Sequence, residues 1–121
     1  MDADEFDEFR ARFADDFVRE DHRRLITLPS VSFDDFIDSV RAYWEIGSGA
    51  PLISVAEVID VRGDHLVLFR ARVEFSDGTA TEFLSIDEYD EQMRTKRVIS
   101  FDADDHAGAL DELDRLDALI D

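Results

Sequence analysis

Apolar residues recur at helical spacing over the first part of the chain, and charged residues fill most positions between them. Four phenylalanines stand three or four residues apart: Phe6, Phe9, Phe13 and Phe17. This spacing predicts an amphipathic helix from about Asp4 to Phe17, with one apolar stripe. A stripe of aromatic side chains is typical of a helix that packs on a core.

The spacing changes to that of a strand from Phe17 to Leu28, where Pro29 ends the segment. Alternate residues then fall on opposite sides of an extended chain. One side carries Val18, Glu20, His22, Arg24, Ile26 and Leu28. The other carries Phe17, Arg19, Asp21, Arg23 and Leu25. The pattern predicts a strand with an unusually charged centre.

A second helix is predicted to begin after Ser32, a natural N-cap, with Asp35 as the acidic partner of a capping box. Its apolar stripe contains Phe33, Phe36, Ile37, Val40 and Trp44. Gly47 and Gly49 are expected to end it.

The segment from Leu52 to Phe101 reads as four strands joined by tight turns. The strands are expected at about Leu52–Val61, His65–Phe75, Ala80–Tyr89 and Met93–Phe101. Turn residues separate them at Arg62–Asp64, Asp77–Gly78 and Asp90–Glu91. Short turns predict an antiparallel meander. A final helix is expected to be capped by Asp102, with Asp105 at the box position and apolar residues along one face.

Length and charge limit the classes of protein that fit this pattern. The 121 residues suit one domain, 1–121, and no cysteine is present for a disulfide or a thiolate site. The net charge of −18 opposes binding to nucleic acid or to an anionic membrane. The acidic start lacks the basic and apolar parts of a secretory signal, so a cytoplasmic protein is expected.

The order helix, strand, helix and long meander resembles the nuclear-transport-factor-two-like superfamily, and in particular its SnoaL-like domains. The similar segments are Phe17–Arg24, Phe33–Phe36 with Tyr43–Trp44, and Val98–Leu113. The resemblance implies an α+β fold in which a cone-shaped, curved antiparallel sheet is packed by an N-terminal helix and a second helix. The C-terminal helix is an addition to that core. One departure is that the family often has two helices before the first strand, whereas this chain has room for one.

The resemblance also implies a largely apolar cavity, in which enzymes of the family use a carboxylate or histidine with a tuned pKa. If one side of the first strand faces the cavity, His22 is the candidate general base, Glu20 orients its ring and Arg24 holds an anionic group. If the other side does, Asp21 is the candidate, with Arg23 beside it. We prefer His22, because the apolar neighbours on its side look buried. Tyr43 and Trp44 are candidate ligand-binding residues at the cavity mouth.

A structural alternative stays open for each of these residues. The charged strand centre can form cross-strand ion pairs, for example with Arg70 or Arg72, and Tyr43 and Trp44 can be core residues. An acid already neutralised by an arginine would argue against catalysis. Asp102, Asp104, Asp105 and His106 fit a helix cap better than a metal site, and no motif for a metal or another cofactor is present, so none is expected.

Three functions remain. The first is a non-catalytic domain that binds a small, largely apolar ligand and forms a homodimer through the sheet. The second is a lyase or isomerase that uses His22 or Asp21 as its base. The third is an interaction or sensory module of a larger bacterial regulator. The sequence favours the first, because it contains no convincing catalytic constellation.

Overall fold

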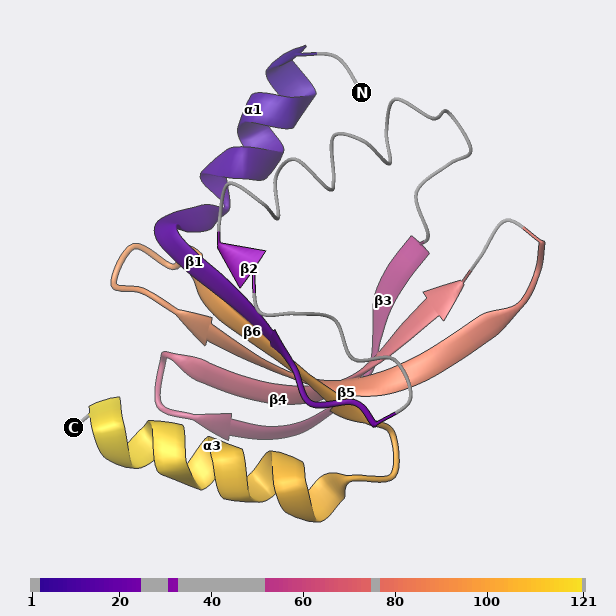
Figure 1. Ribbon diagram of the computed structural model, residues 1–121. Coiled ribbons are helices and arrows are strands. Elements are labelled where there is room, and N and C mark those ends of the chain that lie inside the picture. Colours follow the sequence, from indigo (N-terminus) through magenta and orange to yellow (C-terminus); the bar gives the residue numbers. More distant parts are fainter. Residues whose placement is uncertain (1–2, 25–30, 33–51, 75–76, 121) are drawn as a thin grey trace.

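The computed structural model describes residues 3–24, 31–32, 52–74 and 77–120, and two helices lie on opposite faces of a curved sheet there (Figure 1). The helices are α1 (Ala3–Ala11) and α3 (His106–Ile120). The strands are β1 (Phe13–Asp21), β2 (Val31–Ser32), β3 (Leu52–Arg62), β4 (Leu66–Glu74), β5 (Ala80–Tyr89) and β6 (Thr95–Asp102). The α+β class and the curved sheet predicted from the sequence are confirmed.

The sheet has the strand order β2-β1-β6-β5-β4-β3. Strands β3 to β6 form the predicted antiparallel meander. Strand β1 pairs with β6 in the parallel direction and with the short β2 in the antiparallel direction. The first strand therefore lies beside the last one, and the charged centre of β1 is next to β6.

The meander turns where the sequence predicts it. Gly63 and Gly78 have φ values of 57° and 89°, a region that glycine enters without a steric penalty. The Asp77 carboxylate accepts hydrogen bonds from the backbone N–H and hydroxyl of Thr79. These local bonds fix the turn at Asp77–Thr79, directly before β5.

The first helix is shorter than predicted. It ends at Ala11, and Phe13 and Phe17 belong to β1 rather than to a helix reaching Phe17. A spacing of four residues also returns a side chain to the same side of a strand, so the spacing of these two rings could not separate the two cases. The predicted aromatic rings are nevertheless in contact. Ring centroids are 5.1 Å apart for Phe9 and Phe13 and 5.0 Å apart for Phe13 and Phe17.

The larger core lies between α3 and one face of the sheet, here called the outer face. It consists of Leu66, Leu68, Leu84, Ile86, Ile99, Phe101, Ala109, Leu113 and Leu116. The opposite face, here called the inner face, carries buried Phe17, which packs with Phe9 of α1 and with Val98. In Figure 1 the sheet accordingly lies between the two helices.

The cap of α3 differs from the prediction. The helix begins at His106, and the Asp105 carboxylate accepts the backbone N–H of Gly108 at 3.1 Å, so Asp105 is the N-cap. Asp102, expected to be the cap, instead accepts two hydrogen bonds from Arg24. The start of the helix is therefore three residues later than the sequence indicated.

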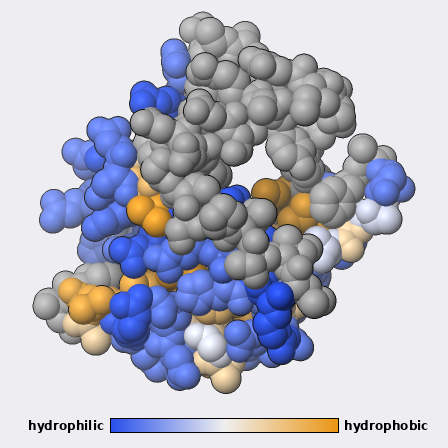
Figure 2. All heavy atoms as spheres, in the orientation of Figure 1, coloured by the Kyte–Doolittle hydropathy of each residue, from blue (hydrophilic) through white to orange (hydrophobic). Residues whose placement is uncertain are grey.

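Some predictions fall on residues outside the described part of the chain. They are the end of the first strand from Leu25 to Leu28, the second helix, its two closing glycines, and Tyr43 and Trp44 on it. In the view of Figure 2 most of the coloured surface is hydrophilic, in keeping with the net charge of −18. No helix in the described ranges is both long and apolar enough to cross a membrane.

Candidate functional site

His22 and Glu20 lie on the outer face of the sheet. Glu20 is in register with buried Ile99, and the His22 ring is 4.9 Å from the Phe101 ring. The His22 Nε2 lies 3.4 Å from a Glu20 carboxylate oxygen. The predicted contact between these two residues is therefore present, but on the side that α3 covers.

Asp21 and Arg23 lie on the inner face, where Asp21 is in register with Ser100. The Arg23 guanidinium donates to both Asp21 oxygens, at 2.8 Å and 2.6 Å, and the Arg23 backbone N–H donates to one of them at 3.0 Å. The Asp21 side chain is only 3% exposed. This hydrogen bonding raises the pKa of Arg23, and the guanidinium lies 5.5 Å from the centre of the Phe83 ring.

Arg24 binds acids after the last strand rather than an anion beside His22. Its Nε is 2.8 Å from Asp102, and its other guanidinium nitrogen is 2.7 Å from Asp104. The hydrogen bonds from Arg24 lower the pKa of Asp102. Since the Arg24 side chain is 70% exposed, this contact ties the end of β1 to the start of α3 at the surface.

The structure thus divides the predicted site between two faces. His22 and Glu20 lie on the face that α3 covers, and Asp21 and Arg23 lie together on the inner face. Which of His22 and Asp21 faces a cavity stays a prediction. Arg70 and Arg72 pair with Glu57, Glu74 and Glu82, and not with the acids of β1.

A polar group that the sequence analysis missed lies on the inner face of β5. The Ser85 hydroxyl donates a hydrogen bond of 3.0 Å to the Asp87 carboxyl, and Tyr89 donates another. Burial raises the pKa of Asp87 to about 6, although both hydrogen bonds act in the opposite direction. Burial, together with the neighbouring Asp87 carboxylate, also raises the pKa of Tyr89.

The signal for this group was present in the sequence. Ser85, Asp87 and Tyr89 alternate with Leu84, Ile86 and Glu88, so they share one side of the strand. What the alternation does not show is that this side is shielded from water. That property raises the pKa of the carboxyl, and it depends on neighbouring strands.

The surroundings of Asp87 are mainly apolar. Val67 of β4 and Val98 of β6 are its direct neighbours in register. Phe69 lies beside Ser85, and Phe83 is next along the same side of β5. A half-buried acid, a hydroxyl and a phenol on an apolar surface can hold the polar end of an otherwise apolar molecule.

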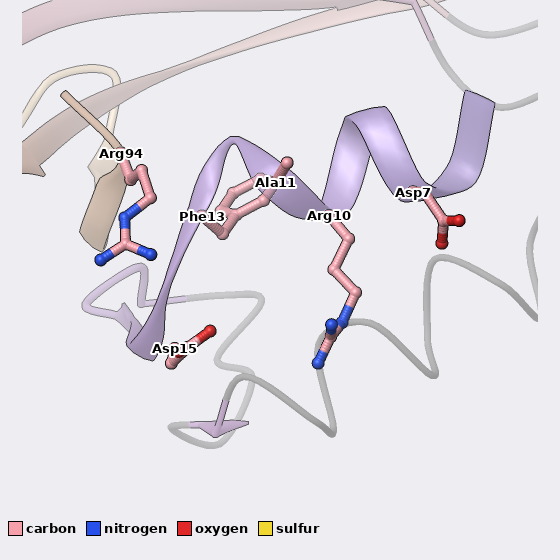
Figure 3. A pocket seen from close by; sticks show the side chains of 6 residues that line it. All are labelled: Asp7, Arg10, Ala11, Phe13, Asp15 and Arg94. Atoms are coloured by element: carbon pink, nitrogen blue, oxygen red, sulfur yellow. The ribbon is translucent and has the colours of Figure 1, made fainter. Parts of the chain in front are cut away.

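A separate pocket of about 280 Å³ lies at the corner between α1 and β1 (Figure 3). Its lining residues are Asp7, Arg10, Ala11, Phe13, Asp15 and Arg94. The Arg94 guanidinium is 2.9 Å from the Asp90 carboxylate. Arg94 is therefore already paired, and the carboxylates of Asp7 and Asp15 offset the charge of Arg10. The pocket has no excess charge that would favour one class of ligand.

Metal binding has no candidate group in the described ranges, where no three histidine, cysteine, aspartate or glutamate side chains converge. The acids at the start of α3, considered from the sequence, have other roles. Asp102 and Asp104 pair with Arg24, and Asp105 caps the helix.

Solved proteins with the same fold share little sequence with this chain. A SnoaL-like family protein from Agrobacterium tumefaciens is 15% identical over 79% of this chain and 81% of its own, with a TM-score of 0.58. A Mycobacterium tuberculosis epoxide hydrolase of the LEH-like type is 14% identical over 81% and 66%, with a TM-score of 0.61. Another M. tuberculosis protein, solved in complex with estradiol-17β-hemisuccinate, is 16% identical over 81% of both chains, with a TM-score of 0.55.

These similarities define the class of fold. The chain has the NTF2-like fold, in which SnoaL-like proteins are also found, as its sequence suggested. No protein-family model matches the chain, and no curated protein matches it by sequence.

Proposed function

We propose that this domain binds a small, largely apolar ligand on the inner face of its sheet, without catalysing a reaction. The observation that carries the proposal is the Ser85–Asp87–Tyr89 group on the apolar inner face of β5. A polar group shielded from water is costly unless it has partners, so such groups mark places where a ligand can complete the hydrogen bonding.

The fold relatives support the size and chemistry of this ligand. One of them was solved with estradiol-17β-hemisuccinate, a rigid apolar molecule with polar ends. The pairing of Asp21 with Arg23 supports a binding role over a catalytic one. A carboxylate whose two oxygens are both bonded to a guanidinium is a poor proton acceptor.

Calorimetric titration with estradiol-17β-hemisuccinate tests the binding proposal. Phe69 and Arg70 are neighbours on β4 that point to the inner and outer faces. We expect Phe69→Gln to weaken binding roughly tenfold, because it removes apolar contact from the inner face. Arg70→Gln is the matched control and should bind like the wild type. Equal effects of both variants, or no binding by the wild type, would overturn the proposal.

Proton transfer is a second candidate, favoured by one observation. A carboxyl whose pKa is raised to about 6 can accept and return a proton near neutral pH. Asp87, rather than His22 or Asp21, would be the base of such an isomerase. A β,γ-unsaturated ketone tests this: the rate of double-bond migration should rise with pH around 6 and be lost in Asp87→Asn. No reaction above the buffer rate counts against catalysis.

We further propose that the domain forms a homodimer, using the open edge of β3 rather than the outer face. On the outer face α3 already covers the apolar residues of β4, β5 and β6. Strand β3 ends the sheet order and exposes four apolar side chains: Ile53, Val55, Val58 and Val61. An unpaired strand edge with apolar side chains is suited to pairing with another chain.

Sedimentation equilibrium tests the dimer. Val58 is 57% exposed and lies near the middle of the strand. We expect the wild type to sediment as a dimer and Val58→Lys to sediment as a monomer with an unchanged melting temperature. A control substitution on the exposed side of α3, Leu119→Lys, should leave the dimer intact. A monomeric wild type would refute this proposal and leave the ligand-binding proposal untouched.

A further inference from the structure

Arg19 lies on the inner face of the sheet. One nitrogen of its guanidinium, Nε, is buried and has no hydrogen-bond partner among the described residues. Arg19 is in register with Val98, on the same face as Asp21 and Arg23. Burial lowers the pKa of Arg19, and the nearby Asp21 charge only partly opposes that effect.

The nearest acid is already engaged. Both oxygens of Asp21 accept hydrogen bonds from the Arg23 guanidinium, and one of them also accepts the Arg23 backbone N–H. Two arginines thus share one aspartate on this part of the inner face.

Asp87 does not neutralise Arg19 either. Both residues flank Val98 in register, one on β1 and one on β5, so their Cα atoms are two strand spacings, roughly 10 Å, apart. A guanidinium close to Asp87 would lower the pKa of that carboxyl. Instead burial raises it, and only Ser85 and Tyr89 act against burial.

The buried Nε of Arg19, which has no hydrogen-bond partner among the described residues, is costly for the free protein. A planar guanidinium is also well suited to bind a carboxylate through paired hydrogen bonds. Resting on the proposed function, we infer that the ligand is an amphipathic carboxylic acid, with its carboxylate bound by Arg19 and its apolar body lying over Val98 toward β5.

The alternative is that Arg19 only supports the strand. The Asp21–Arg23 pair next to it needs no help from Arg19, because its hydrogen bonds are already made. A supporting residue would lose stability when replaced by an apolar side chain. A residue kept for a ligand would not, because its replacement removes a desolvated charge.

Binding of a matched pair of probes tests the inference. The probes are estradiol-17β-hemisuccinate and its methyl ester, which differ in the carboxylate. We expect the wild type to bind the acid roughly tenfold more tightly than the ester, the scale of one charge-assisted hydrogen bond. In Arg19→Met this preference should disappear while the ester still binds. Arg70→Met, an arginine on the outer face paired with Glu57, is the control and should keep the preference.

The outcomes distinguish a failure of the carboxylate inference from a failure of the ligand-binding proposal. If both probes bind equally to the wild type, or if Arg19→Met weakens acid and ester alike, the inference is wrong and the ligand-binding proposal stands. If neither probe binds, both fail. Thermal melting without ligand is a second readout. Arg19→Met should melt at the same temperature as the wild type or a few degrees higher, and a fall of several degrees would identify a structural role.

Discussion

The Ser85 hydroxyl donates a hydrogen bond to the Asp87 carboxyl, 3.0 Å away, on the inner face of β5. This bond and the one from Tyr89 are not sufficient to keep the carboxyl acidic, since burial still raises its pKa to about 6. Asp87 is therefore charged at neutral pH at a cost to the folded state. The consequences of that cost can be measured with or without a ligand.

The first prediction concerns stability and pH. Because the pKa of Asp87 is higher in the folded state than its ordinary value of 3.8, the folded state holds more protons between about pH 4 and 6. Stability contributed by this group is therefore full at low pH and is lost as pH rises through 6. A shift of about two pKa units corresponds to up to about 3 kcal/mol.

Asp87→Asn should consequently stabilise the protein at pH 7.5, by about 1 to 3 kcal/mol, and much less at pH 4.5. Urea unfolding at the two pH values measures both effects. Asp111→Asn, an exposed site on α3, makes the same change in net charge and should give no such difference. A variant that is equally stable relative to wild type at both pH values would disprove the assignment.

The second prediction concerns the affinity of the proposed carboxylate ligand. Ionised Asp87 repels a carboxylate held by Arg19, so binding of estradiol-17β-hemisuccinate should tighten as pH falls from 7.5 to 5.5. The arginines of the inner face stay charged over this range. Binding by the Asp87→Asn variant should be nearly independent of pH, because the group that repels the ligand is gone.

The third prediction concerns the ion pair on β1. Asp21 is almost fully buried, and its loss would remove the carboxylate that binds the Arg23 guanidinium. A double-mutant cycle of Asp21→Asn and Arg23→Gln, followed by urea unfolding, should give a coupling energy of about 1 to 3 kcal/mol. A coupling near zero would mean that the two side chains act independently, against the geometry of the pair.

The fourth prediction concerns the outer core. Leu113 is fully buried between α3 and the sheet, whereas Leu119 on the same helix is 69% exposed. Leu113→Ala should cost about 2 to 5 kcal/mol of unfolding free energy. Leu119→Ala should stay within about 0.5 kcal/mol of the wild type. Similar losses for both would indicate that α3 does not pack as described.

Several elements followed from the sequence alone, for local reasons. Alternation of apolar and polar residues located the four strands of the meander, and glycines with positive φ fit the turns at Gly63 and Gly78. The final helix was recognised from its apolar stripe, which packs through Leu113 and Leu116. Each of these features depends on residues close together in the chain, so a single sequence contains the information.

The site depended on the tertiary structure. Alternation along β1 separated His22 from Asp21 but could not say which side faces α3, because that depends on where distant helices dock. The parallel pairing of β1 with β6 decided it and placed Glu20 beside Ile99. The same assembly shielded Asp87 from water and left Arg19 without a hydrogen bond at Nε. Face, burial and unmet hydrogen bonding arise only when segments far apart in the chain come together, and they are the properties from which the binding site was inferred.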